Sequence, residues 1–326
     1  MVSLEVITAL AKRRGFVFPG SEIYGGLAGT WDYGPLGAEL AHNIKESWWN
    51  HFVRSHKENY AIISSILTPE SVLKASGHVE GFADPLVECK KCKKHFRADD
   101  PDIKENTCPL CGGLLSQPRQ FNMMFQADGS YLRPEIAQGM FVNFKNVLDT
   151  MRPSLPFGIA QIGKAFRNEI SPRDFLFRAR EFDLMEFEYF VRESEWEKYF
   201  ERWRKEIWAW IEKIGIDTNA VHELEVPKEE RAHYSKRTID FEFDFPFGRK
   251  ELYGLAYRGN YDLSRHEHHT GSDLKYTDPE SGEKFLPHVI EPTFGLGRTI
   301  LAVLLSAYAE DDLPAQAGLG GEKRVF

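Results

Sequence analysis

The sequence predicts an α+β fold in which helices flank an antiparallel sheet. Residues 157–169 and 178–190 alternate between apolar and polar side chains and are joined by a short loop, as expected of two antiparallel strands. Residues 239–245, IDFEFDF, alternate strictly between apolar and acidic side chains, which is typical of a half-buried antiparallel strand. Helical patterns lie between these strands, and this order favours α+β over a doubly wound parallel sheet. The acidic residues of the third strand share one face, which we expect to meet solvent: Asp240, Glu242 and Asp244.

The composition indicates a soluble, well-packed protein. Of the 326 residues, 42% are hydrophobic and 28% are charged, unlike a disordered chain. The net charge of −8 argues against a broad nucleic-acid-coating surface but is compatible with a local basic groove. The longest apolar run, residues 300–309, is about half of the roughly 20 residues that span a bilayer. Residues 1–15 place their charges after a short apolar segment, the reverse of a secretory signal. We therefore expect a cytoplasmic enzyme with no membrane partner.

Two helices can be assigned from periodicity. Residues 35–53 predict an amphipathic helix, and the β-rich residues 61–67 follow it. Residues 196–214 predict a longer helix, whose aromatic stripe should pack in the core. Ser194 with Glu197 three residues later matches a capping box, which places the start of this helix at Ser194. Gly215 should end the helix.

The four cysteines predict a structural zinc site. Cys89 and Cys92 form one CxxC pair, and Cys108 and Cys111 form a second pair after fifteen residues. This is the spacing of a tetrahedral site in which two tight turns each present two thiolates. The alternative, two disulfides, fits poorly with a reducing compartment.

A histidine-rich segment, RHEHHTGSD at 265–273, could suggest a second metal site. His266, His268 and His269 lack the i, i+4 spacing of a helical zinc pair, and the Gly and Ser suggest a loop. We expect no metal there.

An arginine-rich hairpin, FRNEISPRDFLFRAREF at 166–182, suggests an anion site in an otherwise acidic chain. Arg178, Arg180 and Glu186 have the same parity on the return strand and should face one side. Guanidinium groups bind phosphate oxygens in a bidentate manner, which suits a polyphosphate. The alternative is a set of cross-strand ion pairs with Glu169, Asp174 and Glu181. Arg173 is expected to hold only the loop.

The segment EPTFGLGRTILAVLLSAYAE strengthens the first interpretation. Gly295 and Gly297 precede an apolar helix, and Arg298 lies in its first turn. A glycine-rich approach to a helix N-terminus allows backbone groups and the helix dipole to meet an anion. Together with the hairpin, this segment predicts a nucleotide site with arginines at both ends.

These segments resemble motifs 1, 2 and 3 of class II aminoacyl-tRNA synthetases. The finer resemblance is to the dimeric glycyl-tRNA synthetases, and it covers about residues 5–310. The matching segments are SGHVEGFADPLVECKKC, FRAD, YLRPEIAQG, FRNEISPR, RAREFDLMEFEYF, YDLSRH and PHVIEPTFGLGR.

The resemblance implies a class II catalytic domain, with a six-stranded antiparallel sheet, a four-cysteine zinc-knuckle insertion and a homodimer formed through motif 1. It implies glycine–tRNA ligase activity, in which ATP and Mg²⁺ serve the activation of glycine and the product is glycyl-tRNA(Gly). The regions would be 1–70 with motif 1, 71–130 with the zinc knuckle, 131–310 with motifs 2 and 3, and a helical insertion at about 191–237. Residues 311–326 look like a linker, so we expect a fragment that stops before an anticodon-binding domain.

The resemblance also implies site residues. The ATP contacts would be Arg167, Asn168, Glu169, Phe177, Arg178, Arg180, Glu181, Phe182, Glu251, Leu252, Gly295, Leu296, Gly297 and Arg298, with Phe182 stacked on the adenine and Glu251 a candidate Mg²⁺ ligand. The glycine contacts would be Arg97, Glu135, Phe182, Met185, Glu186, Glu291, Thr293 and Gly295. The residues expected to matter most for catalysis are Arg167, Arg298 and Glu135.

The implied chemistry suits these residue types. The carboxylate of glycine itself attacks the α-phosphorus, so positioning and charge neutralisation suffice and no protein nucleophile is needed. Two other functions stay open: a non-catalytic synthetase-like binding module, and a synthetase for another small amino acid. The first would usually lack the arginines of motifs 2 and 3, whereas Arg167 and Arg298 are present.

Overall fold

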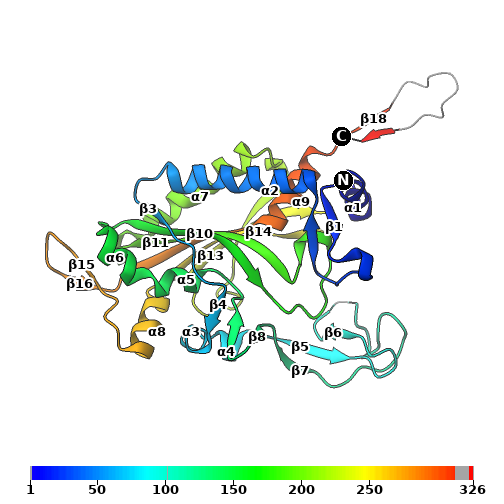
Figure 1. Cartoon of the computed structure of the whole chain (residues 1–326), viewed down its shortest axis with the longest axis horizontal. Helices are drawn as coiled ribbons and strands as arrows, with labels where there is room; N and C mark the ends of the chain where they lie inside the picture. Colours follow the sequence, from blue (N-terminus) through cyan, green and yellow to red (C-terminus); the bar gives the residue numbers. More distant parts are fainter. Residues whose placement is uncertain (1, 101, 313–322, 326) are drawn as a thin grey trace.

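The computed structural model describes residues 2–100, 102–312 and 323–325, so the expected linker at 311–326 lies mostly outside the described residues (Figure 1). The helices are α1 (Leu4–Arg13), α2 (Pro35–Trp48), α3 (Glu70–Ala75), α4 (His78–Gly81), α5 (Ala137–Val142), α6 (Phe144–Met151), α7 (Trp196–Lys213), α8 (Tyr261–Thr270) and α9 (Leu296–Ala307). The small strands are β1 (Val17–Pro19), β2 (Trp31–Tyr33), β4 (Leu67–Pro69), β5 (Ala83–Glu88), β6 (His95–Arg97), β7 (Arg119–Asn122), β8 (Phe125–Ala127), β9 (Ser130–Leu132), β15 (Tyr276–Thr277), β16 (Lys284–Phe285), β18 (Glu310–Asp312) and β19 (Lys323–Val325). None of the described helices has the length and apolar character to cross a membrane.

A central seven-stranded sheet forms the framework on which the helices pack. Its strands are β12 (Val221–Glu225), β13 (Arg237–Phe245), β14 (Gly248–Gly259), β17 (His288–Gly295), β11 (Glu181–Val191), β10 (Phe157–Phe166) and β3 (Asn59–Ala61), in that spatial order. Six strands run antiparallel, and β3 adds a short parallel edge beside β10. The expected β10–β11 hairpin and the strand at 239–245 are confirmed, and so is the α+β class.

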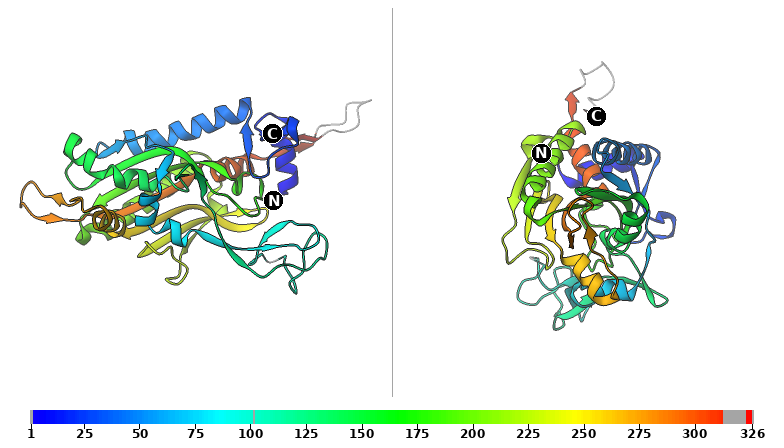
Figure 2. Two further views of the ribbon diagram at one scale, coloured as in Figure 1. Left: turned by 60° about the horizontal axis from the view of Figure 1, so that its bottom comes forward. Right: turned by 90° about the vertical axis from the view of Figure 1, so that its left-hand side faces the viewer.

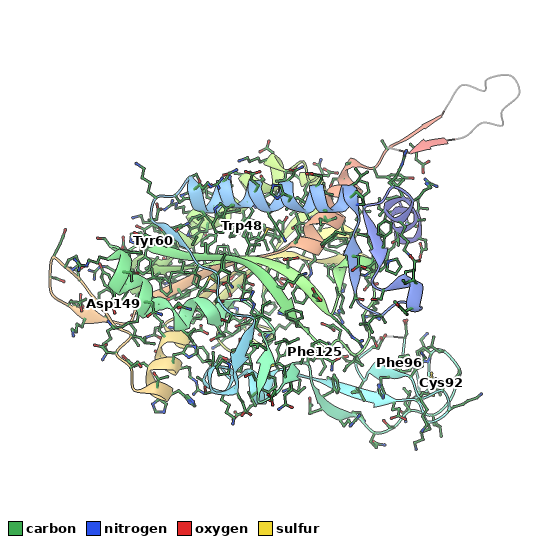
Figure 3. All side chains as sticks on the ribbon, viewed as in Figure 1. Trp48, Tyr60, Cys92, Phe96, Phe125 and Asp149 are labelled. Atoms are coloured by element: carbon green, nitrogen blue, oxygen red, sulfur yellow. The ribbon has the colours of Figure 1, made fainter. Side chains whose placement is uncertain are left out.

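Helices cover both faces of this sheet (Figure 1). On one face, side chains from α1, α2, α7 and α9 join Phe187, Tyr253 and Phe294 of the strands in the larger hydrophobic core. On the other face, α5, α6 and α8 enclose a smaller core with Phe157 and Phe190. Trp48 at the end of α2 points from that helix toward the sheet (Figure 3) and is fully buried. The smaller core fills only part of its face, so the remaining area is free to form a site.

Three local expectations need correction. Helix α7 begins at Trp196 with Glu195 as N-cap, not at Ser194, because a 3₁₀ turn precedes it and no side chain caps its first turn. The end at Lys213 before Gly215, whose φ is +77°, is as expected. The histidine-rich segment is mostly helix α8 rather than a loop, because the chain reaches Gly271 before it turns. The resemblance implied six strands, and β3 is a seventh.

Residues 83–122 form an insertion that projects from the main body (Figure 2). Strands β6, β5 and β7 make a small antiparallel sheet, and a cluster around Val87 and Phe96 forms its own core. Both Cys92 and Phe96 lie far from the central sheet in Figure 3. The insertion still returns Asp84 and Arg97 to the edge of the cleft described next.

Candidate active site

Two adjoining cavities lie on the face of the sheet that carries α5 and α8. We call the first the arginine chamber, with a volume of about 270 Å³ and walls that include Arg97, Arg167, Arg178 and Arg298. We call the second the glutamate chamber, with a volume of about 330 Å³ and walls that include Glu135, Glu186, Glu230 and Glu291. Arg167, Glu186, Glu251 and Thr293 line both chambers, so the two form one continuous cleft.

Arg167 follows β10 directly and lies at the junction of the chambers. Its Nε donates to the carbonyl of Pro134 at 3.0 Å, which anchors the guanidinium. The guanidinium carbon lies 5.3 Å from the ring centroids of both Phe82 and Phe182. These contacts leave its terminal N–H groups available to an anion in the arginine chamber.

Arg298 lines the arginine chamber from the first turn of α9. Its guanidinium packs 4.3 Å from the centre of the Phe177 ring and reaches the Glu251 carboxylate at 3.0 Å. Gly297 allows this arrangement, because a Cβ there would stand 2.7 Å from the carbonyl oxygen of Leu176. The glycine-rich approach to α9 thus serves close packing of the 175–177 turn against the helix.

The arginine chamber contains many of the residues expected to bind ATP. Those that line it are Arg167, Glu169, Phe177, Arg178, Phe182, Glu251, Leu252, Gly295, Gly297 and Arg298. Others lie elsewhere: Leu296 is in the larger core, Glu181 pairs with Lys164, and the backbone of Asn168 bonds to Met123.

Arg180 does not share a face with Arg178 and Glu186, as the alternation along the strand had predicted it would. Strand β11 begins at Glu181, so Arg178 and Arg180 precede the strand and do not share its alternation. Arg178 lines the chamber, whereas Arg180 donates to the carbonyl of Glu169 at 3.1 Å and braces the loop. Arg173 also holds the loop, through Asp100 at 3.0 Å.

Three residues expected to contact glycine differ in how they lie relative to the cleft. Met185 is fully buried in the larger core, on the side of the sheet that faces away from the cleft. Arg97 lines the arginine chamber, where it pairs with Asp84 and with Asp99 at 2.7 Å. Glu186, in contrast, faces the cleft from β11 and lines both chambers.

A chain of buried hydrogen bonds organises the glutamate chamber. His78 Nε2 lies 3.2 Å from one oxygen of Glu135, and Gln138 donates to the other at 2.9 Å. Gln138 also donates to Asp262 at 3.0 Å, and its oxygen lies 2.8 Å from His266 Nε2. Glu135 therefore has both of its oxygens held in place before any ligand arrives.

Arg258 completes this chain. It donates to both oxygens of Asp262, at 2.8 and 2.7 Å, and to Glu291 at 2.8 Å. It is fully buried, and its guanidinium carbon lies 3.7 Å from the centre of the Tyr234 ring. The network links Glu135 and Glu291 through Gln138, Asp262 and Arg258, three residues to which the sequence patterns assigned no role.

Burial and charge set the protonation of this chamber. Burial alone would lower the pKa of His78, but the charge and hydrogen bond of Glu135 outweigh it and raise that pKa. Burial would raise the pKa of Glu135, yet His78 and Arg258 hold it well below its usual value. Burial, and then the charges of Glu291 and Glu135, raise the pKa of Glu186 well above its usual value. The chamber thus contains carboxyl groups whose pKa values are shifted in opposite directions.

The register of the sheet explains which side chains form the floor. Glu186 pairs with Thr293, Thr293 with Gly254 and Gly254 with Asp240, so these four positions form one row across the sheet. Asp240 lines the glutamate chamber, which corrects the expectation of solvent for that residue. Burial and the neighbouring charge of Glu251 raise its pKa to about 7. Alternation alone could not reveal this, because it does not show that residues of the distant segment 226–234 line a chamber together with Asp240.

The four cysteine sulfurs converge in the insertion. All ligand atoms of Cys89, Cys92, Cys108 and Cys111 lie within 4.8 Å of one another, with separations of 3.5 Å for Cys89–Cys111 and 3.7 Å for Cys92–Cys108. A tetrahedron of thiolates with metal–sulfur bonds of about 2.3 Å requires sulfur separations of about 3.8 Å. The thiols are free, which excludes the disulfide alternative in this structure. Among the described residues, no histidine cluster of this kind occurs.

Comparison with known proteins agrees with this geometry. Residues 121–307 match the family described as tRNA synthetase class II core domain (G, H, P, S and T). A "Glycine--tRNA ligase" of Treponema denticola is 47% identical over 323 residues, covering 95% of this chain and 72% of the relative. Proteins of the same name from Caldanaerobacter subterraneus subsp. tengcongensis and Geobacillus thermodenitrificans are each 46% identical, over 99% and 95% of this chain and 77% and 74% of their own lengths.

Proposed function

Because this chain belongs to the glycine–tRNA ligases of the class II synthetases, we propose that its two chambers divide the substrates, with ATP in the arginine chamber and glycine in the glutamate chamber. The overall reaction joins glycine to tRNA at the expense of ATP. Activation comes first: the glycine carboxylate attacks the α-phosphorus, pyrophosphate leaves, and glycyl-adenylate remains. A hydroxyl of the tRNA terminus then takes the glycyl group and releases AMP.

The observation that carries the proposal is the junction of the chambers at Arg167 and Glu186. An arginine beside the reacting phosphate neutralises charge that develops in the transition state. A carboxylate on the other side of the same junction receives the ammonium group of an amino acid. The reacting carboxylate and the α-phosphorus then meet between these two residues, so positioning supplies the catalysis.

Arg298 and Glu251 form a further part of the wall of the proposed ATP site. Arg298 would neutralise the terminal phosphates, and Phe182 would stack on the adenine. Glu251 and Asp240 fit a Mg²⁺ ion, because they lie close enough for the charge of Glu251 to raise the pKa of Asp240, and neighbouring carboxyl groups offer the oxygen ligands that Mg²⁺ takes. When bound, Mg²⁺ supplies further neutralisation of the phosphates.

Glu135, Glu186 and Glu291 are the proposed ammonium ligands. Glycine has no side chain to grasp, so selectivity rests on excluding a Cβ, and rejecting a larger substrate sterically is easier than rejecting a smaller one. Arg258 would hold Glu291 in place through their 2.8 Å contact. Under this proposal, specificity for glycine comes from three glutamates held in fixed positions, and not from a pocket that binds a substrate side chain.

Two alternative functions remain testable. A non-catalytic binding module would not need both Arg167 and Arg298 in one cleft, and both line the arginine chamber. A synthetase for another small amino acid differs only in what the glutamate chamber admits.

Amino-acid-dependent exchange of pyrophosphate into ATP separates the three functions. We expect exchange with glycine and background exchange with alanine and serine at equal concentration. Exchange with serine or alanine alone would transfer the specificity to that substrate. Absence of exchange with every amino acid would favour the binding module.

We also propose that the four cysteines hold a structural Zn²⁺. All four positions of a tetrahedral site would be occupied by thiolates, so no position is open for a substrate. The ion would fix the turns of the insertion, which has only a small core of its own.

A homodimer and a cytoplasmic location complete the proposal. Ile63 is 95% exposed, and Leu67 is 57% exposed, next to the edge strand β3 of motif 1. Apolar side chains presented in this way suit a contact with a second copy. Light scattering on the native chain and on Ile63→Asp tests this, with a shift toward monomer expected for the variant. We propose a cytoplasmic location because the charging of tRNA serves protein synthesis, which takes place in the cytoplasm.

A further inference from the structure

Two carboxyl groups of β11 differ in their access to the cleft. Glu186 and Glu188 are two residues apart and therefore face the same side of the sheet, whereas Phe187 between them packs in the larger core. Glu186 is 3% exposed and Glu188 is fully buried. Glu186 lines both chambers and Glu188 lines neither. Only Glu186 can therefore touch a small ligand.

The arginines around these two residues make their hydrogen bonds to other groups. Arg258 binds Asp262 and Glu291, and Arg133 donates to backbone carbonyls. Arg167 donates through Nε to the carbonyl of Pro134, which leaves its terminal N–H groups to the arginine chamber. Within the described part of the chain, neither oxygen of Glu188 has a hydrogen-bond partner, and Oε2 of Glu186 has none. A buried ionised carboxylate without a partner is strongly disfavoured, so such a group takes up a proton.

The charged groups around Glu186 and Glu188 also favour their protonated forms. The charged groups that act on the pair from the neighbouring elements are Glu135, Arg258, Asp262, Glu291, Arg133 and Arg167. The titratable groups His78, His266 and Tyr234 contact Glu135, Gln138 and Arg258 of the same network. Burial, and then the charge of Glu291, raise the pKa of Glu188 well above its usual value. Arg258 opposes this shift without cancelling it.

We propose that Glu188 stays protonated throughout, and that glycine binding expels one proton, from Glu186 alone. This inference rests on the proposed placement of glycine in the glutamate chamber. Glu188 has no route to the ligand and no hydrogen-bond partner among the described residues, so it stays in the neutral form that burial favours. Its proton thereby limits the negative charge that the chamber must hold.

Glycine binding replaces the proton of Glu186 by the ammonium group of glycine. The protonated Glu186 loses H⁺ to solvent, and its carboxylate then receives the glycine ammonium, which keeps all three of its own protons. No bond of glycine is broken, and no other co-reactant is needed. Because the proton is lost on binding, a rise in pH favours binding until Glu186 is already ionised in the empty chamber.

Proton release can be counted directly. Glycine is added to the native chain in the absence of ATP, in a weakly buffered solution at pH 7 that contains phenol red. We expect release that approaches one proton per glycine bound at saturation. Glu186→Gln should release none, and it also corrects for any pH difference of the glycine stock.

Variants of Glu188 separate its role from that of a ligand. Glu188→Gln keeps a neutral donor of the same shape, so release should still approach one proton. Its kcat/KM for glycine in pyrophosphate exchange should fall by less than about tenfold, the value of one neutral hydrogen bond. Glu186→Gln should lose about a hundredfold, because a charge-assisted contact is stronger. Glu280→Gln, on an exposed turn, serves as the unchanged control.

Three results would overturn the inference. Release of no proton by the native chain means that Glu186 is already ionised, and release of two means that Glu188 ionises as well. A folded Glu188→Gln that loses as much kcat/KM as Glu186→Gln means that Glu188 acts as a carboxylate. If another amino acid replaces glycine in the exchange assay, the proposed function fails, yet the proton count with that amino acid still decides this inference.

Discussion

His78 Nε2 faces the Glu135 carboxylate across 3.2 Å in the interior of the chain, and this carboxylate raises the pKa of the imidazole. The hydroxyl of Ser76 lies 2.8 Å from His78 Nδ1 and holds the other side of the ring. The nitrogen that faces the carboxylate donates to it. Glu135 thus has a buried partner, which orients it toward the proposed ammonium site.

This pair should make stability depend on pH. The folded pKa of His78 is raised, so its contribution is fully present below the ordinary histidine pKa of about 6.5 and is lost as pH rises through the folded pKa. The pKa of Glu135 is lowered, so its contribution is lost only in strong acid. His78→Gln should reduce the free energy of unfolding by roughly 1.5–3 kcal/mol near pH 6, and by less near pH 9. Urea denaturation followed by tryptophan fluorescence measures both values.

His268→Gln is the matched control for that experiment, because His268 is exposed on α8. It should change the free energy of unfolding little at either pH. A difference between native and His78→Gln that is equal at pH 6 and pH 9 would show that His78 is neutral.

Arg167 should be required for activation but not for folding. Arg167→Gln removes the guanidinium at the junction of the chambers, and we expect pyrophosphate exchange to fall by at least about 10²–10³-fold. Its circular dichroism and zinc content should match those of the native chain. Arg173→Gln removes an arginine of the same hairpin that binds Asp100 instead, and its exchange should change little. Equal losses in the two variants would contradict the assigned roles.

Arg258 should be needed for both stability and glycine affinity. Arg258→Met leaves Asp262 and Glu291 buried without their cation, which should cost about 3–5 kcal/mol of unfolding free energy. Arg258→Lys keeps a charge but cannot reproduce the fork that binds both carboxylates, so it should be intermediate. In exchange assays with the lysine variant, KM for glycine should rise more than KM for ATP. The opposite order would place Arg258 in the ATP site.

Zinc should stabilise the insertion alone. Cys108→Ser should lose most of the roughly one Zn²⁺ per chain expected from a single four-thiolate site, as measured by elemental analysis. Hydrogen exchange should accelerate across residues 83–122 and stay unchanged in β10, β11 and β17. Lys91→Gln, an exposed change between Cys89 and Cys92, should keep its zinc. Accelerated exchange in the central sheet would contradict an independent insertion.

The sequence predicted features that depend on local alternation or spacing. Strict alternation set the face of each residue in β13, and the two CxxC pairs brought four sulfurs together as expected. Local signals failed where a competing local structure was available. Ser194 matched a capping box, but the chain forms a 3₁₀ turn there and α7 begins later.

The linking residues of the glutamate chamber could not be found in this way. Gln138 and Asp262 are 124 positions apart, and Arg258 and Glu291 are 33 apart, so only the folded sheet and helices bring them together. The signal available was weak: an arginine at the end of a strand followed by Asp262 four positions later. Glu188 gave no signal at all, because its importance lies in having no partner among the described residues.

The most direct measurement for the central claim is the identity of the adenylate that the chain forms. The native chain is mixed with ATP, Mg²⁺ and an equimolar mixture of isotopically distinguishable glycine, alanine and serine, and is quenched in acid after a single turnover. We expect glycyl-adenylate at close to one equivalent per active chain, with the alanyl and seryl forms absent. Predominance of alanyl- or seryl-adenylate, or no adenylate at all from a folded, zinc-containing chain, would contradict the proposed function.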